Sequence, residues 1–290
     1  MRTKGLPLLI LAIITLGIVA FAAEKPSDSP WKLVVESRIT HKSNLAGFYD
    51  NKNGITVGPS GECHYTENAG KSWPSGTNFS ACRYGLEIVD AKIAWHCGNG
   101  GHVRLSMDGG HSWMPVADFG RPTPNQCRFL SFVDDQTGWI ASPYGMMAKT
   151  TDGATTWNAV KLPEGMDDIA AISLLTKDIG YILDMSGMLY KTNDGGQTWS
   201  SSESGFKDAP MAMKLLTPQE AMRFIDEKHG VIVACLNDDK VYASITTDGG
   251  KTWKREKIPG SMGPVFLSRD GRTLTVNQSK VIRVYQRSTF

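Results

Sequence analysis

Five eight-residue segments recur along the chain, and each of them ends in tryptophan. The closing tryptophans are separated by 40, 44, 42 and 54 residues. Repeats at a period near 40–45 residues are typical of β-propellers, in which each repeat forms one four-stranded blade. The segments are TENAGKSW (66–73), SMDGGHSW (106–113), TTDGATTW (150–157), TNDGGQTW (192–199) and TTDGGKTW (246–253).

The similarity between the units extends upstream of these segments. A short apolar run ends in a polar residue, and four residues later a small residue opens a second apolar run. The runs are short and rich in β-branched and aromatic residues, with turn residues between them, so each unit is predicted to contain four strands and no helix. The polar residues are Asp50, Asp90, Asp134, Thr176 and Asp226, and the small residues are Gly54, Ala94, Gly138, Gly180 and Gly230.

A sixth unit at the end of the chain stops before its fourth strand. Phe266–Ser268, Arg272–Val276 and Val281–Tyr285 supply three strands, and the chain ends at residue 290. Trp31–Val35 resembles the strands that follow the tryptophan segments, and it could complete the last blade and close the ring. We therefore predict an all-β, six-bladed β-propeller of four-stranded blades closed by an N-terminal strand. Seven blades are the alternative, because the last interval is about ten residues longer than a blade.

The eight-residue segment, here called the box, has the chemistry of a hairpin loop. Aspartate accepts hydrogen bonds from backbone N–H groups, glycine adopts positive φ, and tryptophan buries a large aromatic surface. Turn chemistry accounts for each residue type, and loops spread around a rim cannot converge on one substrate. We therefore predict a structural role for Asn68, Trp73, Asp108, Trp113, Asp152, Trp157, Asp194, Trp199, Asp248 and Trp253.

These repeats resemble the Asp-box, or BNR, repeats of sialidases, sortilin, xyloglucan hydrolases and the photosystem II stability/assembly-factor propellers. The blade CRFLSFVDDQTGWIASPYGMMAKTTDGATTW (127–157) is most similar to the last of these families. The resemblance covers nearly the whole chain after the N-terminus. It implies a propeller that binds a protein partner during assembly, although that family usually has seven blades and a lipoprotein cysteine.

A sialidase-like or other glycoside hydrolase is the alternative that the same repeats raise. The early Arg-Ile/Leu-Pro motif of sialidases is absent, because Arg38 and Ile39 are followed by Thr40. Three arginines precede or begin innermost strands and could face the central channel, where guanidinium groups would suit a carboxylate or an acidic peptide. These candidate partner-binding residues are Arg83, Arg128 and Arg223.

The N-terminus has the pattern of a secretory signal peptide. Arg2 and Lys4 precede an apolar run that ends in Ala20-Phe21-Ala22, which predicts cleavage after residue 22, a linker over 23–30 and one propeller domain over 31–290. An uncleaved membrane anchor is the alternative. Without residues 1–22 the chain has 29 basic and 29 acidic side chains, so no nucleic-acid partner is expected.

The five cysteines are an odd number, so at least one thiol must stay unpaired in an oxidising compartment. We expect mainly buried thiols, with at most one disulfide among the first four, and no metal or cofactor, because no close pair has zinc-ligand spacing. The pairing itself stays open. The cysteines are Cys63, Cys82, Cys97, Cys127 and Cys235.

Taken together, the sequence predicts an exported, periplasmic or extracellular, monomeric propeller. Its expected task is non-catalytic binding of a protein or glycan partner. The stretch from Ser200 to Pro218 breaks the rhythm of the repeat, so we expect it to form an irregular excursion that contributes to partner contact.

Overall fold

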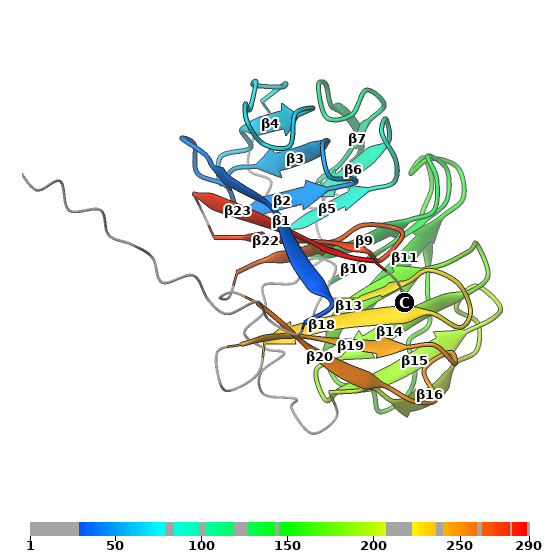
Figure 1. Cartoon of the computed structure of the whole chain (residues 1–290). Helices are drawn as coiled ribbons and strands as arrows, with labels where there is room; N and C mark the ends of the chain where they lie inside the picture. Colours follow the sequence, from blue (N-terminus) through cyan, green and yellow to red (C-terminus); the bar gives the residue numbers. More distant parts are fainter. Residues whose placement is uncertain are drawn as a thin grey trace, which may run out of the picture.

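The protein is a ring of six antiparallel sheets (Figure 1). The structure, a computed structural model, describes residues 29–78, 84–98, 102–118, 127–142, 145–206, 222–235, 240–259, 263–278 and 280–288. Within these ranges every regular element is a strand, and no helix occurs that is long and apolar enough to cross a membrane. The predicted signal peptide, Cys82 and Arg83 lie outside the described residues.

Each sheet is one blade, and the blades are numbered here in chain order. Blade 1 consists of β2 (Leu45–Phe48), β3 (Gly54–Val57) and β4 (Cys63–Thr66). Blade 2 consists of β5 (Gly85–Ile88), β6 (Ala94–Cys97), β7 (His102–Ser106) and β8 (Met114–Asp118). Blade 3 consists of β9 (Phe129–Phe132), β10 (Gly138–Ser142), β11 (Met146–Thr150) and β12 (Asn158–Ala159).

The second half of the ring repeats this order. Blade 4 consists of β13 (Ile169–Leu174), β14 (Gly180–Asp184), β15 (Met188–Thr192) and β16 (Ser200–Glu203). Blade 5 consists of β17 (Met222–Phe224), β18 (Gly230–Cys235), β19 (Val241–Thr246) and β20 (Lys254–Ile258). Blade 6 combines β21 (Val265–Leu267), β22 (Thr273–Asn277) and β23 (Val281–Arg287) with β1 (Trp31–Arg38) from the other end of the chain.

The predicted closure of the ring is confirmed. Strand β1 lies beside β23 as the outermost strand of blade 6, with Val35 opposite Val284 and a bulge at Val34 (Figure 1). Trp31 is fully buried and packs with side chains of blades 5 and 6. Six blades, rather than seven, therefore complete the propeller, and the first and last strands of the chain hold it shut.

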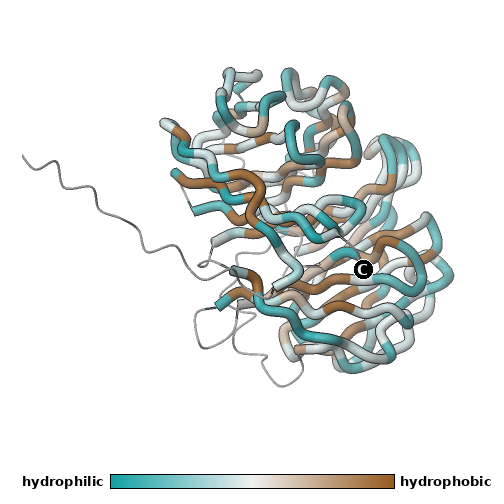
Figure 2. The backbone as a smooth tube through the Cα atoms, viewed as in Figure 1, coloured by the Kyte–Doolittle hydropathy of each residue, from teal (hydrophilic) through white to brown (hydrophobic). Residues whose placement is uncertain are grey.

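Apolar residues concentrate in the strands and hydrophilic residues in the turns (Figure 2). The small residue that opens each second strand has a packing reason. A Cβ at Gly138 would lie 2.2 Å from the ring of Phe132, and a Cβ at Gly230 would lie 2.7 Å from that of Phe224. In blades 1, 3 and 5 an aromatic ring from the first strand thus lies on the start of the second, and glycine leaves room for it, whereas at Gly180 the ring is that of Trp139 in the preceding blade.

The structure differs from two of the sequence-based expectations, one for the segment after Ser200 and one for the fourth strand of blade 1. Ser200–Glu203 form β16, the regular fourth strand of blade 4, so the predicted excursion does not begin at Ser200, and residues 207–218 lie outside the described ranges. The fourth strand directly follows the box tryptophan in blades 2, 3 and 5 as well. In blade 1, by contrast, the place of a fourth strand is marked by the single bridge between His64 and Ser75.

The three cysteines whose side chains are described are buried and unbridged. Cys97 donates from Sγ to the carbonyl of Cys127 at 3.2 Å, and Cys63 accepts a hydrogen bond from Trp113 at 3.1 Å. Burial raises the pKa of the Cys63 thiol to about 12. These thiols pack as small apolar groups between neighbouring blades, and none of these three described cysteines takes part in a disulfide.

Candidate functional site: the axial channel and the box face

The strands of each blade alternate in direction, so their turns fall on two faces of the ring. The turns from first to second strand and the box turns from third to fourth strand share one face, here called the box face. The first strand of each blade starts at the opposite face. Any site must therefore lie on the box face, on the opposite face or along the channel between them.

On the box face, the carboxylate of each box aspartate is bound within its own loop. In box 2, Asp108 Oδ1 accepts hydrogen bonds from Ser106 Oγ at 2.9 Å and Ser112 N at 2.8 Å, and Oδ2 accepts from Ser112 Oγ. Asn68 makes the equivalent contacts in box 1, with its amide donating to Ser72 Oγ at 2.7 Å. The same pattern recurs at Asp152, Asp194 and Asp248.

The backbone of each box is more constrained than the sequence pattern indicated. Its fourth and fifth positions both have positive φ, as at Gly109 (71°) and Gly110 (92°). The fourth position, which is alanine or glycine in all five boxes, is therefore restricted by its backbone conformation. Ala69 and Ala154 adopt positive φ in boxes 1 and 3. A Cβ at Gly110 would lie 2.8 Å from Ile55 of the preceding blade, so the box also packs one blade against the next.

The ionisation of these aspartates does not suit acid catalysis. Hydrogen bonds from the hydroxyl and amide of Thr252 lower the pKa of Asp248 to about 2, and the equivalent bonds from Thr198 lower the pKa of Asp194 further. Burial opposes the shift at Asp108, but the bonds from Ser112 and Ser106 still lower its pKa. A general acid that works near neutral pH needs a raised pKa. The box carboxylates therefore stay ionised and bound to their own hairpins.

The channel is crossed by a buried ion pair. Arg223, the middle residue of β17, extends to Glu87 in β5, with Nη2 at 3.0 Å from both carboxylate oxygens. The side chains are 3% and 0% exposed. Blades 2 and 5 are opposite one another in a ring of six, so the pair joins two blades across the axis. Arg223 thus lies at the channel, but its guanidinium is engaged inside the protein.

A second arginine links another pair of opposite blades, blade 6 and blade 3. Arg269, in the turn after β21 of blade 6, donates from Nη1 to the carbonyls of Phe132 and Val133 at the end of β9, at 3.0 and 2.8 Å. These carbonyls lie at the box-face end of blade 3. Two arginines therefore link opposite blades, and neither Arg269 nor Glu87 was indicated by the repeat pattern.

At the opposite face, Arg128 lies directly before β9, and Tyr84 lies directly before β5. The Arg128 guanidinium carbon is 5.1 Å from the centroid of the Tyr84 ring, a cation–π distance. Both side chains are half-buried. Of the three predicted arginines, Arg128 is at the mouth of the channel, Arg223 is inside it, and Arg83 is outside the described residues.

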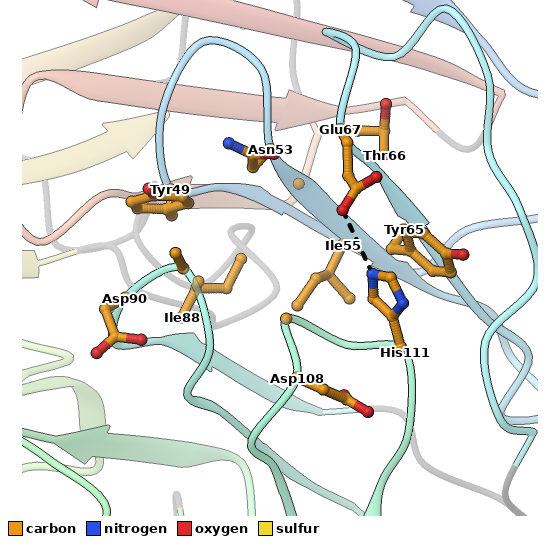
Figure 3. Close-up of a pocket in the computed structure, with 13 residues that line it drawn as sticks. Tyr49, Asn53, Ile55, Tyr65, Thr66, Glu67, Ile88, Asp90, Asp108 and His111 are labelled. Atoms are coloured by element: carbon orange, nitrogen blue, oxygen red, sulfur yellow. Dashed lines mark ion pairs between the residues drawn. The ribbon is translucent and has the colours of Figure 1, made fainter.

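A pocket of about 60 Å³ opens on the box face between blades 1 and 2 (Figure 3). Ile55 and Ile88 form an apolar part of its lining, with Tyr49 and Asp90 on one side. On the other side the His111 ring stacks on Tyr65 with centroids 3.7 Å apart, and its Nε2 lies 3.6 Å from Glu67 (Figure 3). No group of three His, Cys, Asp or Glu side chains in the described ranges is placed to hold a metal ion.

Comparison with known sequences places this propeller beside one group of assembly proteins. The sequence model of the family described as "Photosynthesis system II assembly factor YCF48" matches residues 77–206, which cover blades 2 to 4. The photosystem II assembly lipoprotein Ycf48 of Synechococcus sp. (strain CC9902) is 31% identical over 158 residues, which are 52% of this chain and 46% of that protein. Blades 2 to 4 of this β-propeller are thus similar in sequence to a photosystem II assembly factor.

Solved structures agree on the propeller fold. The structure of YCF48 bound to a D1 peptide superposes with a TM-score of 0.58 at 15% identity, covering 91% of this chain and 99% of that one. YCF48 from Cyanidioschyzon merolae gives 0.52 at 14% identity, covering 89% and 98%.

The fold is not restricted to binding proteins. A catalytically inactive virginiamycin B lyase from Staphylococcus aureus gives a TM-score of 0.59 at 10% identity, covering 88% of this chain and 99% of that one. The fold is therefore shared with enzymes, and it does not by itself decide the function. The match in sequence spans about half the length of the Synechococcus protein.

Proposed function

We propose that this protein is an exported, non-catalytic propeller that holds a protein partner while a larger complex is assembled. The observation that carries the proposal is the sequence similarity to Ycf48 across blades 2 to 4. One solved YCF48 has a D1 peptide bound, which supports a peptide segment of a protein, rather than a glycan, as the partner. The N-terminal signal pattern supports export, with 1–22 removed and 31–290 acting as one domain.

The site geometry favours binding over hydrolysis. A retaining or inverting glycosidase needs two carboxyl groups on either side of the scissile bond, one of which has a raised pKa. The box carboxylates are instead ionised and bound within separate loops around the ring. Glu87, at the channel, is buried and paired with Arg223.

Within this proposal, Arg128 is the residue that contacts the partner. Its position before β9 places it at the mouth of the channel, and Tyr84 supports the guanidinium from one side. Because the contacts of Arg223 and Arg269 link opposite blades across the axis, a partner segment would lie across the mouth rather than pass through. A carboxylate on that segment would form a charge-assisted pair with Arg128.

Binding of a fluorescently labelled D1 peptide, measured by anisotropy, tests the proposal. Arg128→Ala should weaken binding about tenfold or more, since a charge-assisted hydrogen bond is worth about 1.5–3 kcal/mol. Arg272→Ala, an exposed arginine in a turn on the box face, is the matched control and should bind as the unaltered protein does. Equal affinity of both variants would exclude Arg128 from the site.

An enzymatic function makes a different prediction. Turnover of fluorogenic sialosides or glucans that Arg128→Ala abolishes would overturn the binding proposal in favour of a hydrolase. Crosslinking in the native envelope followed by mass spectrometry would identify the partner. Analytical ultracentrifugation tests the expected monomer.

A further inference from the structure

Blade 1 is completed by a short strap in place of a fourth strand. The strap is defined here as residues 73–77, which follow box 1. It is held to β4 by hydrogen bonds from Tyr65 N to Pro74 O at 3.2 Å and from Gly76 N to Cys63 O at 2.8 Å. The backbone contact between strap and β4 is therefore much shorter than the paired outer strands of blade 4 or blade 5.

Two stacked imidazole rings lie against the first half of the strap. His64, in β4, has Nδ1 at 3.3 Å from the carbonyl of Trp73 and at 3.5 Å from Ser75 Oγ. The ring of His41 stacks on that of His64, with centroids 3.7 Å apart and planes 12° from parallel. His41 Nε2 shares a hydrogen bond of 2.8 Å with Thr56 Oγ1 in β3. His64 is thus the histidine that contacts the strap, and His41 stacks on His64.

The surroundings of the stack shift the pKa of His41 in opposite directions. Burial of His41, together with the neighbouring His64, lowers the pKa of His41 to about 4, and Glu62 in the turn before β4 only partly offsets this. The rings of Trp73 and His41 are in T-shaped contact, with centroids 6.3 Å apart, and Trp73 supplies no charge. A proton on His41 is therefore unfavourable while the strap is closed, because its charge would lie in a half-buried site beside a second imidazole ring.

The second half of the strap has a different anchor. Thr77 donates from N and from Oγ1 to the carbonyl of His111, at 3.0 and 3.3 Å. Protonated His111 would form an ion pair with Glu67, 3.6 Å away, while Tyr65 stacks on its ring (Figure 3). Acid therefore does not weaken this anchor in the way that it weakens the stack.

We propose that the strap is an acid-sensitive element of blade 1. Protonation of His41, stacked on His64, releases Trp73–Gly76 from β4, while Thr77 stays attached to blade 2. Release exposes the edge of β4 and lets the His41 imidazolium ring reach solvent. The proposal concerns blade 1 alone, so it holds or fails independently of the partner proposed above.

Hydrogen exchange of the full chain at pH 7.5 and pH 5.5, corrected for intrinsic rates, tests this proposal. Opening restores the ordinary pKa of His41, near 6.5, so the opening equilibrium should rise about tenfold between the two pH values. The amides of Tyr65 and Gly76 should lose about tenfold in protection, whereas the amide of Thr77 should change less than threefold. If protection changed equally at all three amides, or at none of them, this experiment on the unaltered protein would by itself overturn the proposal.

A variant separates the histidine stack from general acid effects. His41→Phe keeps a stacked ring but cannot take up a proton, so the response at Tyr65 and Gly76 should disappear. His229→Phe is the matched control, because His229 pairs with Asp226 on a turn of blade 5, and it should leave the response of the strap unchanged. A tenfold response that persists in His41→Phe would also overturn the proposal.

Discussion

The ion pair across the channel makes a quantitative prediction about stability. In Arg223→Met, the carboxylate of Glu87 remains fully buried between the blades without its partner. Removing one member of a buried pair typically costs about 3–5 kcal/mol, because the remaining charge keeps its desolvation penalty. For a domain of this size each kcal/mol lowers Tm by about 2–4 °C, so Tm should fall on the order of 10 °C.

The double variant Glu87→Met/Arg223→Met removes both charges and fills similar volume. It should lie within about 1 kcal/mol of the unaltered protein, because apolar replacement of a buried pair is often neutral or stabilising. Urea unfolding followed by tryptophan fluorescence gives each free energy, and the double-mutant cycle gives the coupling. Arg283→Met, which breaks the exposed pair with Glu36 at 2.9 Å, is the control and should cost less than about 1 kcal/mol. A loss below about 1 kcal/mol in the free energy of unfolding for Arg223→Met would refute the reasoning. So would a double variant whose loss equals the sum of the losses in the two single variants.

Four further predictions follow from single positions and share the same urea assay. Trp31→Ala should cost about 3–5 kcal/mol, since the ring is fully buried where the propeller closes; a smaller loss would mean that closure does not depend on β1. Asp108→Ala should cost about 1 kcal/mol and Asp108→Asn less, because asparagine makes the same contacts in box 1. Gly196→Ala should lower the free energy of unfolding by about 2 kcal/mol or more, since φ is 91° and a Cβ would lie 2.5 Å from Val160. Gly145→Ala also has a positive φ but no atom close to the added Cβ, so it should lower the free energy of unfolding by about 1 kcal/mol. Burial lowers the pKa of His96 to about 3. The contribution of the neutral His96 ring to the free energy of unfolding is therefore complete above pH 6.5 and is lost as the pH falls towards 3. A urea concentration at half-unfolding that stays constant from about pH 7.5 to about pH 5 would contradict this.

Local chemistry in the sequence indicated most of the fold. The polar residue at the end of each first strand was recognised from its position alone, and in the structure Asp134 Oδ1 accepts hydrogen bonds from the amides of Gln136 and Thr137. At Gly54, Gly138 and Gly230, the small residue four positions later marks where an aromatic ring of the first strand lies on the second. Such signals lie within one hairpin, so they recur at every repeat and can be read without knowing the fold.

The candidate site could be predicted only in part. Arg128 and Arg223 were found because they lie beside or within first strands, but their different surroundings were not visible in the repeat. Arg269 could have been noticed as an arginine in a turn where the other units have Asn51, Ala91, Asp135, Lys177 and Glu227. Glu87 gave no signal, since an acidic residue within a short strand is more often exposed.

What the sequence alone determined is the repeating unit and the strand exchange that closes the ring, while it left seven blades open as the alternative to six. A four-stranded unit cannot bury its own faces, so tandem units must stack, and the missing last strand matches the extra first one. Tertiary structure alone decided what lies on the axis and beside blade 1. Glu87 and Arg223 are 136 residues apart. Their contact depends on how many blades complete the circle, and a period along the chain carries no record of which side chains meet across it.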